Sequence, residues 1–345
     1  MKGKVSEEIK IRRVKGRDFE QMFKLITEGF AREIEIVGSD IERLQRMAKF
    51  YRLISNFLFP LNLLNVDFET ILVATLNDKV VGEIHLVPHG RGIWSLDSAA
   101  VDKNFRGRGI YRKLMQEALD YIHEKHGKKI FTSLWTDNIA PIKITSELQY
   151  DVFATETLMI YEPCETSQTN NSQGVLIREA KRDDIEEIFR LCQAAYPKKV
   201  YAQDLTPNDF SDSILERIRN RISGTFSKRL AVEVKGRVGG YAYLTYTSPK
   251  EAGKIEFLCL LPSVASSELV ASLSKYVFNL LAEKNIKKVF ISINEEWKDY
   301  TEAFKRLGFK PFASIYLLVK ELSQYDKDNT RDIVKSPSSA KIVSF

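Results

Sequence analysis

The chain has 345 residues, of which 44% are hydrophobic and 28% are charged, and its formal net charge is +6. This composition excludes a chain that is disordered throughout, and the length suits two domains of common size. The small positive excess is spread along the chain without a basic arm, so we expect no nucleic-acid partner.

The first segments in chain order predict an α/β protein. Apolar periodicity predicts a helix from Asp18 to Phe30, and alternating runs predict a hairpin of strands Thr70–Leu76 and Lys79–Val87. Between them, Leu53–Val66 is strongly apolar and interrupted by Pro60, and it is too short to span a bilayer.

A glycine loop between a strand and a helix is the most informative feature. An apolar run ends at Val101, an amphipathic helix is predicted for Arg112–Glu124, and Arg106-Gly107-Arg108-Gly109-Ile110-Tyr111 lies between them. The glycines allow a tight bend with N–H groups pointing outward, and the arginines and the helix N-terminus add positive charge. The loop therefore predicts an anion site, although alternating glycines also end strands for turn geometry alone. A strand at Ile130–Leu134 follows, with Asn138 just beyond it.

The sequence repeats itself, which predicts two similar domains in tandem. Carried through the glycine loop, the same register places Ala265–Glu268 opposite Arg106–Gly109, and Glu256 opposite Asp97. Both arginines and both glycines are then lost and a carboxylate is gained, so we expect the second copy to keep the fold without the anion site. The repeated segments are Ile11–Glu20 with Ile177–Glu186, Val80–Leu86 with Val238–Leu244, Lys128–Phe131 with Lys287–Phe290, and Gln149–Tyr150 with Gly308–Phe309.

The predicted domain boundaries follow the loss of apolar periodicity. We expect a first domain at 1–162, a polar linker at 163–174, a second domain at 175–322 and a flexible tail at 323–345. The three cysteines have no metal or redox spacing and the first 15 residues carry no export signal, so we expect reduced cysteines and a cytoplasmic protein. His123 and His126 lack the spacing of a zinc motif, so no metal site is expected.

The order Leu96-Asp97-Ser98-Ala99-Ala100-Val101-Asp102, Arg106-Gly107-Arg108-Gly109-Ile110, Leu114-Met115 and Leu119 resembles motif A of the GNAT N-acetyltransferase superfamily. Arg106 and Gly109 match the first and fourth positions of the loop that holds pyrophosphate in that family. Tyr111 stands where Gly or Ala is usual, and this is similar to the variant found in the enhanced-intracellular-survival acetyltransferases. The resemblance implies two tandem GNAT folds, each with a mixed α/β sheet.

The resemblance also implies that acetyl-CoA is the cosubstrate and that the first copy holds it. Asn138 matches a residue that contacts the pantetheine arm in the family, and it could equally be the N-cap of the following helix. The residues assigned to acetyl-CoA on this basis are Ala99, Ala100, Val101, Arg106, Gly107, Arg108, Gly109, Ile110, Tyr111 and Asn138.

The implied activity is transfer of an acetyl group to a primary amine of a small molecule or protein. Such a site must accept a proton and stabilise an oxyanion. Asp97 lies two residues before Ala99, and strict alternation would put both on one face of the strand, so Asp97 is the candidate base or amine-binding residue. A strand-end carboxylate with a structural role is the other interpretation.

The acid that protonates the leaving thiolate is not assigned by the sequence. Thr145 stands where the family usually has a catalytic Tyr, and Tyr111 and Tyr150 both have ready structural roles. Two alternatives therefore stay open: an acyl-CoA sensor without catalysis, and an aminoacyl or long-acyl transferase on the same double fold. Segment Leu53–Val66 is a wall of the acceptor site, a packed helix, or a contact with a membrane surface or another subunit in a homo-oligomer.

Overall fold

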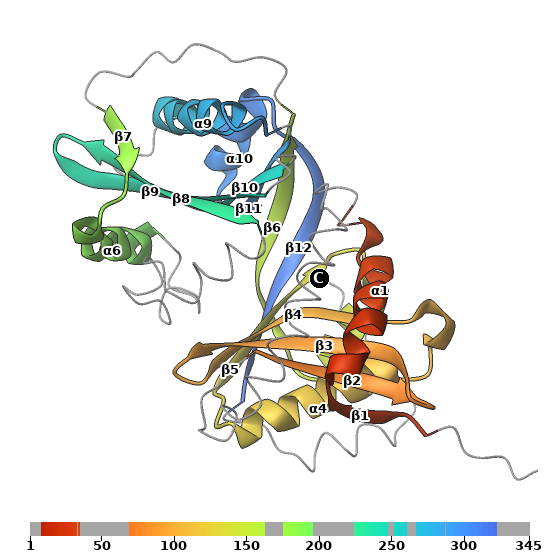
Figure 1. Cartoon of the computed structure of the whole chain (residues 1–345). Coiled ribbons are helices and arrows are strands. Elements are labelled where there is room, and N and C mark those ends of the chain that lie inside the picture. The colour runs from red at the N-terminus through yellow and green to blue at the C-terminus, as the bar shows by residue number, and fades with distance from the viewer. Residues whose placement is uncertain are drawn as a thin grey trace, which may run out of the picture. The chain divides into compact units, whose positions relative to one another are not determined.

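The computed structural model describes residues 8–32, 34, 69–162, 175–195, 224–247, 252–260, 267–286 and 288–322. These residues divide into two compact units, which we describe separately (Figure 1). The first unit contains the described residues of Met1–Gly29, Arg52–Val152 and Leu317–Phe345, and the second contains those of Phe30–Tyr51 and Phe153–Tyr316.

The first unit is built on a mixed sheet whose strands follow the chain order. Antiparallel pairing joins the first four strands, whereas the fourth and fifth are parallel. The predicted hairpin is confirmed, with left-handed Asn77 and Asp78 at its turn. The strands are β1 (Lys10–Arg13), β2 (Thr70–Leu76), β3 (Lys79–Gly90), β4 (Ile93–Val101) and β5 (Lys129–Trp135), followed in the sheet by the end of β12 (Lys310–Glu321).

Helices α1 (Phe19–Gly29) and α4 (Ile110–Glu124) cover opposite faces of this sheet (Figure 1). A Cβ atom on Gly29 of α1 would lie 3.0 Å from the Cβ atom of Ala100, whereas one on Gly82 would lie 3.0 Å from Ile110 of α4. Small residues thus let both helices approach the sheet closely. The helix α5 (Ile139–Glu147) follows β5. The buried face of α4 consists of Ile110, Leu114, Met115, Ala118, Leu119 and Ile122, as its period predicts.

The second unit repeats the plan. Its sheet separates two apolar clusters, one under α6 and one under α9 and α10. Its elements are β7 (Val175–Glu179), α6 (Ile185–Ala195), β8 (Thr225–Val234), β9 (Arg237–Thr247), β10 (Ala252–Leu260), α9 (Ser267–Ala282), β11 (Lys288–Asn294) and α10 (Lys298–Arg306).

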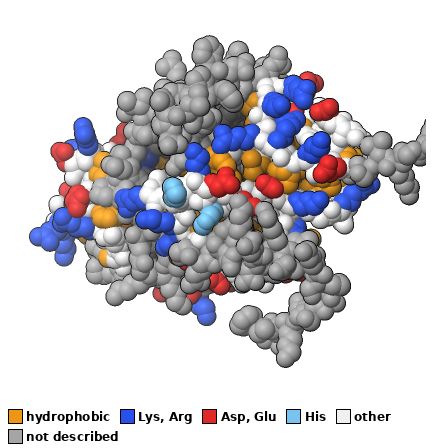
Figure 2. Space-filling model, turned by 90° about the horizontal axis from the view of Figure 1, so that it is seen from below, with side chains coloured by type: hydrophobic (Ala, Val, Ile, Leu, Met, Phe, Trp, Pro, Cys, Tyr) orange, Lys and Arg blue, Asp and Glu red, His pale blue; other side chains and the backbone are white. Residues whose placement is uncertain are grey.

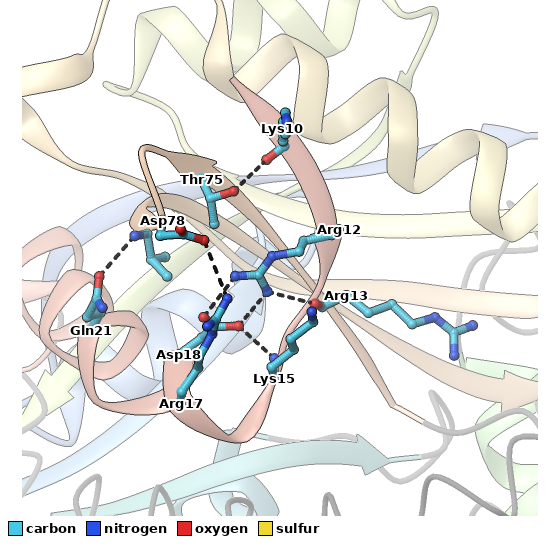
Figure 3. A network of polar contacts seen from close by, with 10 residues as sticks. Lys10, Arg12, Arg13, Lys15, Arg17, Asp18, Gln21, Thr75 and Asp78 are labelled. Atoms are coloured by element: carbon cyan, nitrogen blue, oxygen red, sulfur yellow. Dashed lines mark hydrogen bonds and ion pairs between the residues drawn. The ribbon is translucent and has the colours of Figure 1, made fainter. Parts of the chain in front are cut away.

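One polar network appears in both units at equivalent positions. The guanidinium of Arg12 donates to both carboxylate oxygens of Asp18 at 2.5 and 2.9 Å, and the Lys15 N–H donates to the same carboxylate at 2.7 Å (Figure 3). Arg178 and Asp184 repeat this geometry at 2.6 and 3.0 Å. A bidentate ion pair of this kind, combined with a backbone bond at a helix start, contributes on the order of 2 kcal/mol to each unit.

The ends of α5 and α10 match as well. Gln149 has a φ of 61° and Gly308 a φ of 94°, and in both units the next N–H donates back into the helix at 3.0 Å, from Tyr150 and from Phe309. The tandem repeat expected from the sequence is therefore present in the backbone, including its left-handed helix ends.

Strands β6 (Asp151–Tyr161) and β12 do not stay with the copy that their sequence position suggests. Strand β6 pairs antiparallel with β11 from Glu156↔Asn294 to Tyr161↔Val289. The end of β12 lies beside β5, where the Leu322 N–H donates to the Lys128 carbonyl at 2.7 Å. The last strand of each sequence copy thus joins the sheet of the other copy.

Several expected features lie outside the described residues: the linker 163–174, the tail 323–345, Leu53–Val66 and the Ala265-Ser266 part of the second loop. The domain boundaries based on them stay predictions. No described helix is long and apolar enough to cross a membrane. In the described part of the chain, no three or more His, Cys, Asp or Glu side chains are placed so that they could hold a metal ion.

Candidate functional site

The glycine loop begins directly after β4 and ends in the first turn of α4. Gly107 and Gly109 have φ angles of 76° and 73°, a left-handed conformation that favours glycine. A Cβ atom on either glycine would meet nothing within 4 Å. Gly109 is the N-cap of α4 and has no side chain to occupy its N–H groups. The loop therefore presents open backbone at the positive end of a helix.

Positive side chains surround this open backbone. Arg106 and Arg108 are exposed, and the Nε atom of Arg106 donates to the Val101 carbonyl at 3.2 Å, which ties the loop to the end of β4. The Lys79 ammonium lies 5.1 Å from the Phe105 ring centre, as does the Arg108 guanidinium. Figure 2 shows one face of the molecule, on which Lys and Arg side chains are interspersed with Asp and Glu. This donor set suits a phosphate-rich ligand.

Asn138 reaches the same edge of the sheet by a different route. It follows β5, which runs parallel to β4, and the carboxyl ends of parallel neighbours lie at one edge. Asn138 is the N-cap of α5, but its side chain makes no capping hydrogen bond and is exposed. Asn138 thus occupies the N-cap position, but its side chain does not cap the helix.

The candidate acids are poorly suited to proton donation. Thr145 is fully buried, and its hydroxyl donates within the helix to the carbonyls of Pro141 and Ile142 at 3.1 and 2.9 Å. Burial raises the pKa of Tyr111, which makes its hydroxyl a weaker acid than a free tyrosine. Neither of these two hydroxyls is therefore assigned as the acid.

Strand β4 contains a bulge at Asp97. Leu96 pairs with Leu86 and Ser98 pairs with His85, so Asp97 is the extra residue between them. The ladder between β4 and β5 runs from Ile93↔Lys129 to Leu96↔Thr132, and so ends just before the bulge. Uninterrupted alternation would place Asp97 and Ala99 on one face of the strand, but the bulge interrupts that alternation.

Asp97 takes part in a surface hydrogen-bond chain. The Ser95 hydroxyl donates to Asp97 at 2.5 Å, and Ser95 also contacts Nε2 of His89 at 2.9 Å. Asp97 is exposed, so it is accessible both as a base and as a partner for an ammonium group. Its assigned role stays a prediction.

A second carboxylate near β4 was missed by the sequence reasoning. Glu83 on β3 has no exposed surface, and its cross-strand partner is Ala100. The Ser98 hydroxyl donates to Oε2 of Glu83 at 3.3 Å, while Oε1 has no hydrogen-bond partner. Burial raises the pKa of Glu83 to about 7, against the effects of His85, Ser98 and the Ala100 N–H. A Glu inside the apolar run Val80–Leu86 was the signal that could have identified it.

His85 lies among three carboxylates. Its Nε2 atom is 3.4 Å from Glu69, and Asp97 and Glu83 also act on its charge. Burial alone would lower the pKa of His85, but the ion pair with Glu69 and the charges of Asp97 and Glu83 raise it above the usual value. Glu83 and His85 on β3, Asp97 on β4 and Glu69, which directly precedes β2, together form a polar cluster. We call these four residues the polar cluster.

Comparisons with known proteins bear on the family and the fold. The profile of the Acetyltransferase (GNAT) family matches residues 39–143. A tandem GNAT protein from the clavulanic acid biosynthesis pathway superposes with a TM-score of 0.67 at 13% identity, covering 92% of this chain and 100% of that one. Residues 39–143 thus match the GNAT family. The fold of the chain is a tandem GNAT fold.

Two further solved structures resemble the chain. A GCN5-related N-acetyltransferase from Sphaerobacter thermophilus has a TM-score of 0.64 at 14% identity, covering 91% of this chain and 96% of that one. A GCN5-related glucosamine N-acetyltransferase region of a fungal multi-domain β-N-acetylglucosaminidase has a TM-score of 0.65 at 10% identity, covering 92% of this chain and 38% of that one. No curated protein matched the sequence.

The second GNAT fold retains the bulge. Ile255 pairs with Leu244 and Phe257 with Tyr243, so Glu256 is the extra residue of β10 and corresponds to Asp97. Glu256 accepts a hydrogen bond from Thr245 at 2.8 Å. The carboxylate at the bulge therefore belongs to both GNAT folds.

Proposed function

We propose that the chain is an N-acetyltransferase whose first GNAT fold binds acetyl-CoA and transfers the acetyl group to a primary amine. The observation that carries this proposal is the glycine loop: two left-handed glycines at which a Cβ atom would be free of contacts, alternating with exposed arginines at the start of α4. A chain of phosphates fits such backbone and charge. Ala99, Ala100 and Val101 lead from β4 into this loop and would border the thioester.

The polar cluster supplies what the acceptor side of the reaction needs. An ammonium group must lose a proton before its nitrogen can attack the thioester carbonyl. Asp97 is accessible to bind that ammonium or accept its proton. Backbone N–H groups near the bulge, beyond the last β4–β5 pair, would favour the oxyanion that forms during attack. The departing thiolate takes a proton from the attacking nitrogen or from water.

One observation favours a second function, an acyl-CoA sensor without catalysis. The Thr145 hydroxyl is engaged inside its helix, so the position of the usual catalytic Tyr supplies no acid. A sensor would bind acetyl-CoA tightly and release no thiol with any amine.

A thiol-release screen tests the proposed function. The purified chain is incubated with acetyl-CoA and a panel of primary amines: an alkylamine, a diamine, glucosamine, amino acids and lysine-containing peptides. The proposal predicts amine-dependent release of free CoA with at least one acceptor, and mass spectrometry should show that acceptor gaining an acetyl group. Binding of acetyl-CoA without release across the panel would favour the sensor instead. Long-chain acyl-CoA in a parallel series tests the long-acyl alternative.

A further inference from the structure

The buried carboxylate of the first copy is absent from the second. Glu83 pairs with Ala100 across the sheet, and the equivalent pair in the second unit is Tyr241 with Cys259. Tyr241 is 1% exposed, and its hydroxyl accepts a hydrogen bond from Arg229 at 3.0 Å. Its ring belongs to the apolar cluster under α6. In the second copy, a packed and hydrogen-bonded tyrosine thus occupies the position that holds a carboxylate in the first copy.

The neighbouring pair changes in the same way. His85 pairs with Ser98 in the first copy, and Tyr243 pairs with Phe257 in the second. Phe257 and Tyr243 pack against the same apolar cluster, and the Phe257 ring centre lies 5.9 Å from that of Tyr241. The polar groups at these positions are therefore dispensable for the fold, since an equivalent sheet forms with aromatic residues in their place.

The carboxylate at the bulge behaves differently. Asp97 in the first copy is matched by Glu256 in the second, although the second sequence copy lacks the glycines and arginines of the loop. A carboxylate at the bulge thus accompanies the fold, whereas Glu83 and His85 accompany the glycine loop. This comparison within one chain associates Glu83, more than Asp97, with the chemistry of the loop.

Glu83 is also incompletely satisfied. Its Oε1 atom is buried without a hydrogen-bond partner, while Oε2 accepts from Ser98. A buried carboxylate with an unpaired oxygen is costly, and such groups are rare unless they have a role in ligand binding or catalysis. Its position opposite Ala100 places it beside the segment of β4 that would border the thioester.

We propose that Glu83 accepts the proton of the acceptor ammonium, an inference that rests on the proposed acetyltransferase function. The Glu83 carboxylate takes one proton from the ammonium and leaves a neutral amine. The nitrogen lone pair then forms the C–N bond as the C–S bond breaks, and the electron pair of that bond leaves on sulfur. The second proton of the nitrogen goes to the thiolate, and Glu83 later returns its proton to water.

The surroundings of Glu83 suit a group that changes its charge during the reaction. His85 is the one charged group of the described residues that acts on Glu83, and Ser98 and the Ala100 N–H stabilise its ionised form. On α1, which packs against this face, the charged residues are Glu20, Lys24 and Glu28; all three are exposed and none contributes to the electrostatic environment of Glu83. Asp97 is left to attract the ammonium at the surface.

The test compares Glu83→Gln with Asp97→Asn. Each variant keeps the shape of its side chain and removes its ability to take a proton. The substrates are acetyl-CoA and the panel amine that gives the fastest thiol release with the wild type. We expect Glu83→Gln to lower kcat by about 100-fold or more while acetyl-CoA affinity is unchanged. The acidic limb of wild-type kcat/KM, with an apparent pKa near 7, should disappear. Asp97→Asn should keep that limb and mainly raise the acceptor KM.

The possible outcomes separate the two proposals. Glu83→Gln with wild-type turnover and an unchanged acidic limb would overturn the role of Glu83 while leaving acetyl transfer intact. Loss of acetyl-CoA binding in Glu83→Gln would also overturn it, because the residue would then serve the cosubstrate. A wild-type chain that binds acetyl-CoA but releases no thiol with any amine would overturn the proposed function itself. Glu256→Gln, at the bulge of the second copy, is the matched control and should leave the rate unchanged.

Discussion

Glu83 and Asp97 show how strongly the surroundings decide the chemistry of a carboxylate. Both lie on neighbouring strands of one sheet, yet Glu83 is fully buried and Asp97 is exposed. Burial raises the pKa of Glu83 to about 7, which places its titration in the range useful for a general base. The pKa of Asp18 is shifted in the opposite direction. Burial alone would raise this pKa, but hydrogen bonds from Arg12 and the Lys15 N–H lower it, as expected for a structural ion pair.

The raised pKa of Glu83 predicts a pH-dependent cost to stability. Its folded value of about 7 exceeds the reference value of 4.5, so its contribution to stability is fully present below pH 4.5 and is lost as the pH rises to 7. Glu83→Gln cannot lose a proton. The stability of this variant relative to wild type should therefore increase by on the order of 3 kcal/mol between pH 4.5 and pH 8.

Denaturant unfolding at several pH values measures this difference. Glu256→Gln serves as the control and should track the wild type at each pH. A Glu83→Gln variant whose stability relative to wild type does not change with pH would show that Glu83 ionises normally in the folded chain. A Glu83→Gln variant that is more stable at pH 8 but less active would show that Glu83 lowers stability while it supports activity.

Among the elements, β4, the glycine loop and α4 make up the functional unit that we propose for the first copy. The loop conformation depends on Gly107 and Gly109 in the left-handed region, and the ladder to β5 ends where the bulge begins. At both places, backbone N–H groups lack a backbone partner of their own sheet or helix and can donate to a ligand. The second copy keeps the bulge, and its sequence lacks the glycines.

Gly109→Glu should abolish acetyl-CoA binding, because it adds a carboxylate at the start of α4 and strains a left-handed position. A glycine in the hairpin turn of the second copy provides a control for the effect of backbone strain alone. Gly236 has a φ of 77°, and a Cβ atom there also meets nothing within 4 Å. We expect Gly236→Glu to lower Tm about as much as Gly109→Glu and to bind acetyl-CoA normally. Thermal shift with and without acetyl-CoA measures both effects, and equal ligand-induced shifts in the two variants would refute the assignment of the loop.

Much of the fold could be predicted because it depends on local pattern. The period of α1, the hairpin of β2 and β3 and the glycine loop all follow from the spacing of residues along the chain. The bulge at Asp97 could not be predicted, since it is defined by pairing with His85 and Leu86 on another strand. The exchange of β6 and β12 was hidden for the same reason: alternation fixes the face of a strand but does not identify its neighbour.

The candidate site was only partly visible in the sequence. The loop residues were identified from their types and spacing, whereas Glu83 was overlooked because it lies inside an apolar strand that reads as core. Its burial and its unpaired oxygen are properties of the folded chain. The repeat contained a clue nonetheless, because Tyr241 and Tyr243 replace Glu83 and His85 in two segments that share Val, Gly and Leu at equivalent positions.

Across the whole molecule, two copies of one fold have different side chains at equivalent positions. The first copy has a polar cluster beside β4 and an open glycine loop, and the second has an apolar cluster at the equivalent strands. Strands β6 and β12 each join the sheet of the other copy, so neither sequence copy completes its own sheet. The second sequence copy thus contributes the end of β12 to the sheet of the first. Its own sequence lacks the loop that would hold a cosubstrate.

We propose that each chain has a single acetyl-CoA site and that this site lies in the first copy. Isothermal titration calorimetry of the full chain with acetyl-CoA tests it most directly. We expect a stoichiometry of one for the wild type and no binding for Gly109→Glu, with the binding heat of Gly236→Glu unchanged. A stoichiometry of two, or binding that survives Gly109→Glu, would contradict it.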